Sequence, residues 1–190
     1  MSGRESLAAL LRERSVTHGE FVLSSGQRST YYIDARKTTM SAEGQRLIGP
    51  LALAAIRKAG WLPAAVGGLT MGADPVAYAI ARASADSPPL IEAFSVRKTT
   101  KEHGTRQRIE GNFAKGQPVV VVEDVITSGG SALEAIEVIK AEGGTILGVL
   151  ALVDREQGGR AAIEASGFSV VAITTTSELL SENRELMADG

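Results

Sequence analysis

The chain has 190 residues, of which 44% are hydrophobic and 22% charged, and its formal net charge is −2. This length can bury a substantial core unaided, so we expect one domain over residues 1–190. The acidic balance argues against a protein whose whole surface binds nucleic acid, and the lack of cysteine excludes disulfides, thiolate metal sites and cysteine nucleophiles.

The sequence shows no segment suited to a membrane. The N-terminal stretch MSGRESLAALLRERS is amphipathic but lacks the apolar core of a signal peptide. The longest apolar run, Ile146–Val153, has eight residues, whereas a spanning helix needs about 20. We therefore expect a soluble protein with no membrane partner, and its cysteine-free composition fits the cytoplasm.

The N-terminal third begins with a predicted helix at about 4–14. Two short strands follow, Phe21–Ser24 and Thr30–Asp34, around a turn at 25–28. The next helix is opened by Ser41 and closed near Gly60. Pro50 lies inside this helix and should kink or split it.

From residue 64 onward, short apolar strands alternate with helices. A helix to about Ser84 should begin at Asp74-Pro75, with Asp74 as N-cap and Pro75 in the first helical position. A capping box, Ser131 with Glu134, should open the helix Ser131–Ala141, and another helix is expected near 159–166. The predicted strands are Ala64–Gly68, Leu90–Val96, Pro118–Glu123, Ile146–Val153 and Ser169–Ile173. This alternation predicts an α/β fold with a central parallel sheet flanked by helices.

The stretch VVVVEDVITSGGSALEA, residues 119–135, changes character within a few residues. A buried strand ends in two acids, Glu123 and Asp124, at the sheet edge where such folds bind ligands. The loop Thr127–Ser131 then leads into a helix N-terminus, which favours a phosphate. Carboxylates suit hydroxyl donors or a cation, so the two acids together with the phosphate-binding loop predict a sugar phosphate as ligand. An acidic turn and a capped helix without any ligand remain the alternative. Neither a dinucleotide motif nor a P-loop motif matches.

The segment VVVEDVITSGGSA resembles the phosphoribosyl-pyrophosphate (PRPP) signature of the type I phosphoribosyltransferases. The resemblance implies that the acids bind the ribose hydroxyls and that the loop holds the 5-phosphate. The first acid is Glu123, where family members more often have Asp. The implied PRPP-binding residues here are Glu123, Asp124, Val125, Ile126, Thr127, Ser128, Gly129, Gly130 and Ser131.

Residues 97–111, RKTTKEHGTRQRIEG, hold five basic and two acidic side chains, a net charge of +3. Only Ile109 is large and apolar, so the segment reads as a lid or a disordered segment, with a solvated hairpin as the alternative. SVRKTTKEHG resembles the catalytic loop of the orotate phosphoribosyltransferases, which reaches into the neighbouring subunit. The resemblance implies a homodimer, PRPP contacts from Arg97, Lys98, Lys101 and His103, and catalysis by Lys101, His103 and Asp124.

Three further segments bear on the base that is used. GEFVLSSGQRSTYYID resembles the N-terminal hood (roughly residues 1–40) of the same family, where Tyr32 or Tyr31 could stack on a flat ring; both could equally be core residues. Family members often carry a lysine at Ser24, and Arg36 or Lys37 could replace it.

VGGLTMGADP is the second of these segments and provides another anion site, matching the family's pyrophosphate loop at Thr70, Met71 and Gly72. The third is Arg155, which follows a strand end and suits bidentate binding of a carboxylate, although a surface ion pair is the alternative. The resemblance implies that Arg155 and Thr127, with Tyr32, bind orotate.

The resemblance extends from Gly19 to about Ile173 and implies transfer of a phosphoribosyl group from PRPP to orotate. A purine-type enzyme and a non-catalytic regulatory relative are the alternatives. The expected cofactor is Mg²⁺. This ion takes its ligands largely from water and from the substrates of the enzyme, so we expect no protein residue dedicated to the metal.

Overall fold

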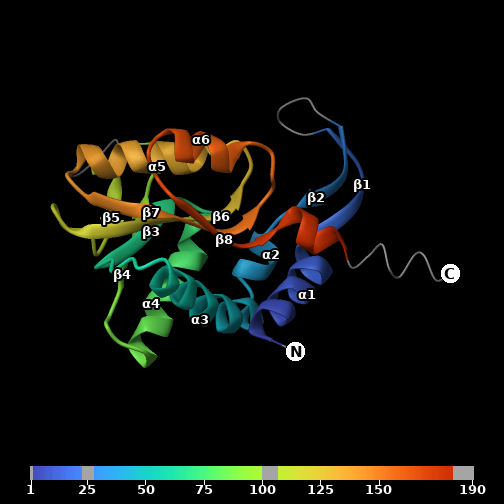
Figure 1. Cartoon of the computed structure of the whole chain (residues 1–190), viewed down its shortest axis with the longest axis horizontal. Coiled ribbons are helices and arrows are strands. Elements are labelled where there is room, and N and C mark those ends of the chain that lie inside the picture. Colours follow the sequence, from blue (N-terminus) through green and yellow to red (C-terminus); the bar gives the residue numbers. More distant parts are fainter. Residues whose placement is uncertain (1, 23–27, 100–106, 182–190) are drawn as a thin grey trace.

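Figure 1 shows the computed structural model of the chain, which describes residues 2–22, 28–99 and 107–181. Its centre is a six-stranded sheet in the order β5-β4-β3-β6-β7-β8. Five strands run parallel, and β5 pairs antiparallel with β4 at one edge. The strands are β3 (Ala65–Leu69), β4 (Glu92–Val96), β5 (Ile109–Gly111), β6 (Pro118–Ile126), β7 (Thr145–Asp154) and β8 (Val170–Thr175).

Helices cover both faces of this sheet (Figure 1). On one face lie α3 (Ala42–Lys58) and α4 (Ala73–Asp86), with α1 (Gly3–Ser15) packed outside α3 and the short α2 (Arg36–Thr39) beside them. The other face carries α5 (Gly130–Ala141) and α6 (Gly159–Ala165). The predicted α/β fold with a central, mostly parallel sheet is confirmed.

The valines of β6 explain why this strand is central. Val120 and Val122 pack in the core beneath α3 and α4, whereas Val119 and Val121 pack in the core beneath α5. Successive side chains of a strand point to opposite faces, so a continuous run of apolar residues serves both cores. All four valines are fully buried.

The hood contains a separate two-stranded antiparallel sheet, β1 (Val16–Val22) and β2 (Arg28–Ile33). Both strands begin earlier in the chain than expected, and Val16 pairs with Ile33. Most of β1 is exposed. The predicted turn at 25–28 falls largely outside the described residues, and Ser24 does so entirely.

Two predicted helix starts are wrong. Helix α4 begins at Ala73 with Gly72 as N-cap, and the Asp74 carboxylate instead accepts a hydrogen bond from Ser95 Oγ at 2.7 Å. Helix α5 begins at Gly130 with Gly129 as N-cap in the left-handed region, at φ 82°. The left-handed backbone conformation costs glycine little free energy, so the chain turns into the helix at Gly129, before it reaches Ser131.

Three other expectations are corrected. Strand β6 continues to Ile126, so Glu123 and Asp124 lie within the strand, because pairing with β7 extends that far. The short β5 was not predicted as a strand, although its antiparallel pairing with β4 agrees with the hairpin alternative for residues 97–111; its Ile109 is buried at the sheet edge. Finally, α3 is not split at Pro50 but runs through it as one helix, because its inner face is held in the core while Pro50 faces outward.

Pro50 therefore gives a test of stability. It occupies an exposed position inside a continuous helix, where it removes a backbone hydrogen bond and crowds the preceding turn. Replacing it with alanine should raise the free energy of unfolding by up to about 3 kcal/mol. Urea denaturation measures this change. Ala54→Gly, at another exposed site of α3, is the control and should lose about 1 kcal/mol; equal or lower stability of Pro50→Ala would contradict the explanation.

Candidate active site

A cleft of about 780 Å³ lies where the carboxyl ends of β3, β6 and β7 face the hood. Ligands of open parallel sheets bind at this edge. The residues that line the cleft come from β2 and the start of α2, the β3–α4 connection, the end of β4, β6 and its following loop, and the end of β7. They are Tyr32, Ile33, Asp34, Ala35, Arg36, Leu69, Thr70, Met71, Gly72, Asp74, Lys98, Glu123, Asp124, Val125, Thr127, Ser131 and Arg155.

The two acids of β6 are held in an unusual environment. Glu123 is 5% exposed, and its Oε1 has no hydrogen-bond partner among the described residues. Burial, and then the charge of Asp124, raise the pKa of Glu123 to about 8, while Lys98 acts in the opposite direction. Burial also raises the pKa of Asp124, and a hydrogen bond from the Val125 N–H partly offsets this.

Next to these acids, the loop after β6 forms a small cradle of about 80 Å³, lined by Glu123 and residues 125–132. No described side chain caps α5, so backbone N–H groups of its first turn are available to an anion. Ser128 and Ser131 add hydroxyl groups to the lining. The Ile126 side chain is buried in the core, which leaves its backbone to serve the cradle.

The second expected anion loop, Thr70–Gly72, lies directly beside the acids. A Cβ atom on Gly72 would stand 2.5 Å from Asp124 Oδ1, which is closer than atoms approach in proteins, so a side chain there would have to move the Asp124 carboxylate. The two segments predicted separately from sequence therefore form one wall of the cleft.

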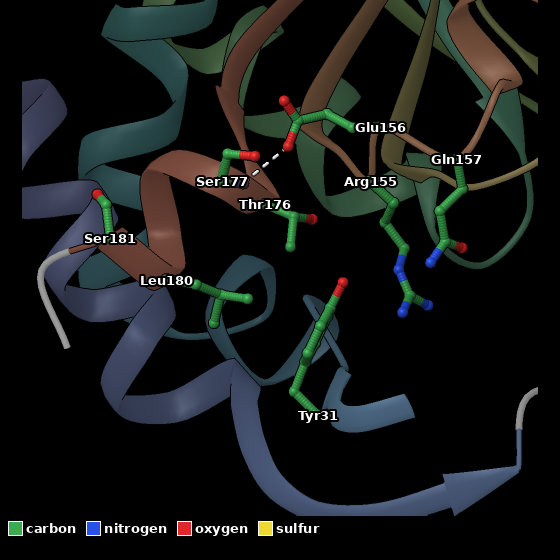
Figure 2. Close-up of a pocket in the computed structure, with 8 residues that line it drawn as sticks. All are labelled: Tyr31, Arg155, Glu156, Gln157, Thr176, Ser177, Leu180 and Ser181. Atoms are coloured by element: carbon green, nitrogen blue, oxygen red, sulfur yellow. Dashed lines mark hydrogen bonds between the residues drawn. The ribbon is translucent and has the colours of Figure 1, made fainter. Parts of the chain in front are cut away.

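Arg155 lies at the far end of the cleft, and also lines a second cavity of about 590 Å³ shown in Figure 2. It is 7% exposed, and its Nε and Nη2 atoms have no hydrogen-bond partner in the described part of the chain. The guanidinium carbon is 5.6 Å from the centre of the Tyr31 ring, and both side chains point into the same space (Figure 2). The alternative of a surface ion pair for Arg155 is wrong.

The hood contributes its inner edge to the cleft. Tyr32 is 41% exposed and lines the cavity, so it is not a core residue. Arg36 also lines the cleft, and Asp34 orients it through Nε–Oδ1 and Nη2–Oδ2 contacts of 2.8 and 3.2 Å. Of the two cations considered as replacements for the family lysine, Arg36 is the one that faces the cleft; Lys37 is not among the lining residues.

The basic segment 97–111 is only partly described. Lys98 lines the cleft, whereas Arg97 lies 3.6 Å from Glu110 and is not among the lining residues. The two ends of the segment are joined, because the Arg97 N–H donates to the Arg108 carbonyl at 2.8 Å. Lys101 and His103 lie outside the described residues.

This arrangement matches a known family. The sequence profile of the phosphoribosyl transferase domain matches residues 41–176. The orotate phosphoribosyltransferase of Sorangium cellulosum is 43% identical over 186 residues, which cover 96% of this chain and 95% of the relative. That of Aquifex aeolicus is 45% identical, with 95% and 99% covered. The chain belongs to the orotate phosphoribosyltransferase family.

Solved structures support the same assignment. Mycobacterium tuberculosis orotate phosphoribosyltransferase in complex with PRPP has a TM-score of 0.80 and 40% identity, covering 94% of this chain and 99% of that chain. The same enzyme with Fe(III) dicitrate gives a TM-score of 0.84 at 43% identity, with the same coverage. The expected type I phosphoribosyltransferase fold and the choice of the orotate enzymes over purine-type enzymes are confirmed.

Sequence reasoning missed two carboxylates of the site. Asp34 orients Arg36, and Asp74 lines the cleft while it binds Ser95. Asp74 was interpreted as a helix cap, and Asp34 was assigned only to a strand end. Both could have been found by noting every acidic residue that lies near the end of a predicted strand, at the sheet edge or at the hood edge.

Within residues 2–22, 28–99 and 107–181, no group of three or more histidine or acidic side chains is arranged to hold a metal ion. Nor is any helix in those ranges both long and apolar enough to cross a membrane.

The buried Glu123 should make stability depend on pH. Its pKa is about 8 in the folded protein and 4.5 in the reference state, so between these values the folded state binds more protons, and stability falls as pH rises. Glu123→Gln removes this ionisation. The advantage of the variant over the wild type in unfolding free energy should grow by on the order of 3 kcal/mol from pH 5 to pH 9.

Chemical denaturation at several pH values measures that difference. Glu142→Gln, at the exposed end of α5, is the matched control for loss of a surface carboxylate. A constant gap between Glu123→Gln and wild type across the pH range would show that the buried carboxyl does not control stability.

Proposed function

We propose that the protein transfers the phosphoribosyl group of PRPP to orotate, forming orotidine 5′-monophosphate and pyrophosphate in pyrimidine nucleotide synthesis. One observation carries this proposal. A buried guanidinium without a described partner, that of Arg155, opens on the same cleft as the sugar-phosphate residues of β6. A site for a carboxylate therefore lies beside a site for a ribose phosphate.

Binding of the sugar phosphate follows from the chemistry of β6 and the loop after it. Glu123 and Asp124 would accept hydrogen bonds from the two ribose hydroxyls, and the cradle at Thr127–Ser131 would hold the 5-phosphate. The unsatisfied Oε1 of Glu123 would gain a partner on binding. These contacts fix the sugar while its anomeric carbon reacts.

The base half rests on Arg155. Its planar fork of donors would bind the orotate carboxylate in a bidentate manner, with Thr127 and Tyr32 on the side of the ring. Both nitrogens without described partners are buried, where a charge-assisted hydrogen bond contributes more than at the surface. A base that lacks the carboxylate would leave the guanidinium unpaired, so binding of such a base is disfavoured.

Reaction requires the bond from the anomeric carbon to pyrophosphate to break while a ring nitrogen of orotate bonds to that carbon and loses its proton to solvent. We infer an oxocarbenium-like state, without a protein nucleophile. Negative charge develops on the leaving pyrophosphate, which we place against Thr70–Gly72. Lys101 and His103 would supply positive charge and a proton donor there, and Asp124 would stabilise the positive sugar.

The charges of the cleft favour additional cations. Its described lining holds four carboxyl groups and three basic groups, namely Asp34, Asp74, Glu123 and Asp124 against Arg36, Lys98 and Arg155. PRPP and orotate are both anionic, so this lining does not neutralise them. We propose that Mg²⁺ would bind together with the anionic substrates in the cleft near Glu123 and Asp124 and would supply part of the positive charge. Lys101 and its neighbours supply the rest.

Arg36 fits the role of the lysine that the family often has at Ser24. Two of its donors are occupied by Asp34, and the remaining guanidinium N–H groups can reach a phosphate or carboxylate oxygen. The pair with Asp34 keeps the side chain in one orientation, which reduces the entropy lost on binding. A homodimer, with segment 97–111 acting in the partner's site, and a cytoplasmic location remain predictions from sequence.

Orotate consumption tests the proposed function. The ultraviolet absorbance of orotate should fall when protein, PRPP and Mg²⁺ are combined, and pyrophosphate should appear in equal amount. EDTA should stop the reaction and excess Mg²⁺ restore it. Hypoxanthine and adenine in place of orotate are the controls and should leave PRPP unchanged. No turnover of orotate at any protein concentration would contradict the proposal.

Subunit exchange tests whether segment 97–111 acts in trans. Lys101→Ala protein and Asp124→Ala protein should each be nearly inactive, whereas mixed dimers would contain one intact site. Activity should therefore return on mixing, towards a quarter of the wild-type level per subunit if exchange is random. Native mass spectrometry confirms that mixed dimers form; mixed dimers without activity would mean that the segment acts in its own subunit.

A further inference from the structure

A short connection joins the two substrate subsites. It runs from Arg155, just after β7, to Gly159, the first residue of α6. Its two ends bond to the end of β6 and to the phosphate loop. The Arg155 N–H donates to the Ile126 carbonyl at 2.9 Å, and the Gly159 N–H donates to the Thr127 carbonyl at 3.0 Å. The carboxylate-binding arginine and the phosphate cradle thus share one backbone link.

Gly159 packs against the phosphate loop without any intervening side chain. A Cβ atom there would stand 2.5 Å from the Thr127 carbonyl oxygen and 2.7 Å from the Gly129 nitrogen. The Ile126 Cγ2 atom would lie 2.6 Å from the same Cβ. Because the other two obstructing atoms are backbone, a side chain at Gly159 would have to displace the loop. The reverse contact is also tight, because a Cβ on Gly129 would lie 2.8 Å from the Gly159 carbonyl oxygen.

The connection is itself held firmly. The buried Asp154 accepts hydrogen bonds from Arg160 Nε at 2.8 Å and from the Glu156 N–H at 2.9 Å. Glu156 in turn accepts from the Ser177 N–H at 2.8 Å, the contact drawn in Figure 2. Because the connection is fixed at its start and its middle, a displacement at Gly159 would be taken up by the phosphate loop.

We propose that Gly159 is a positioning residue for the phosphate cradle: the direct packing of the start of α6 under Thr127–Gly129 sets where the 5-phosphate is held relative to Arg155. This inference rests on the proposed function, since it assumes that the cradle binds the sugar phosphate. On this view, the β7–α6 connection fixes the distance between the cradle that holds the 5-phosphate and the Arg155 side chain that binds the base.

Gly159→Ala tests this role. Ribose 5-phosphate occupies the cradle without needing the pyrophosphate loop, and pyrophosphate is the converse probe. Calorimetry should show at least a tenfold weaker affinity of the variant for ribose 5-phosphate, with pyrophosphate affinity within twofold of wild type. The KM for PRPP should rise. Gly167→Ala is the matched control, because that glycine has φ 91° and open space around it; it should lose stability but keep both affinities.

Three outcomes would overturn the inference: ribose 5-phosphate affinity of Gly159→Ala within twofold of wild type, an equal loss for both probes, or an equal loss in Gly167→Ala. If the wild-type protein consumes orotate and Gly159→Ala consumes it equally well, the inference is refuted but the proposed function is not. Wild-type protein that binds ribose 5-phosphate but never consumes orotate would refute only the proposed function. A wild type that binds no ribose 5-phosphate would refute the inference.

Amide hydrogen exchange in the wild type tests the same contact without a substitution. If the cradle and Gly159 move together, ribose 5-phosphate should slow exchange of the Gly159 amide at least tenfold. The Ser166 amide, bonded to the Ile163 carbonyl at the other end of α6, is the internal reference and should not change. Unaltered exchange at Gly159 would overturn the proposal even if the alanine variant fails to fold.

Discussion

The parallel pairing of β6 with β7 is the constraint on which the site depends. The register places Glu123 beside Ala151 and Ile126 beside Asp154, so both strands leave the sheet at the same level. The two acids, the phosphate cradle and Arg155 are thereby brought to one edge, although some thirty residues separate the first from the last. A change of register by one residue would turn the side chains of one strand to the opposite face.

The sequence revealed the parts of the site that are continuous in the chain. The β6 acids with their loop, Thr70–Gly72 and Arg155 each carry a local pattern, and all lie where strands end. Asp34 and Asp74 carry no such pattern, because only the folded chain brings them to the cleft. The wrong helix starts have a local cause: Gly72 and Gly129 begin the helices earlier than the polar caps that follow them. The three-residue β5 has a single apolar side chain, too weak a signal for a strand prediction.

The site holds polar groups that the folded protein does not satisfy on its own. Glu123 and Arg155 are both buried, with atoms that find no partner in the described chain, and such groups destabilise a fold by about 1–3 kcal/mol each. The rest of the sheet, with its fully buried valines, offsets this cost. A substrate that presents hydroxyls to one group and a carboxylate to the other recovers it, so the same atoms that weaken the free protein favour the bound state.

The two sheets of the protein differ greatly in how they are supported. Strand β6 is paired on both sides and buried on both faces, whereas the hood sheet has two strands and a largely exposed β1. An isolated two-stranded sheet is marginally stable in water, and regions with little buried surface open at low free energy. The β1–β2 sheet is therefore the less supported of the two sheets, whereas α1 of the hood is held in the core through Leu7 and Leu11. Local opening of this small sheet would uncover Tyr32 and Arg36 while the acids of β6 keep their positions.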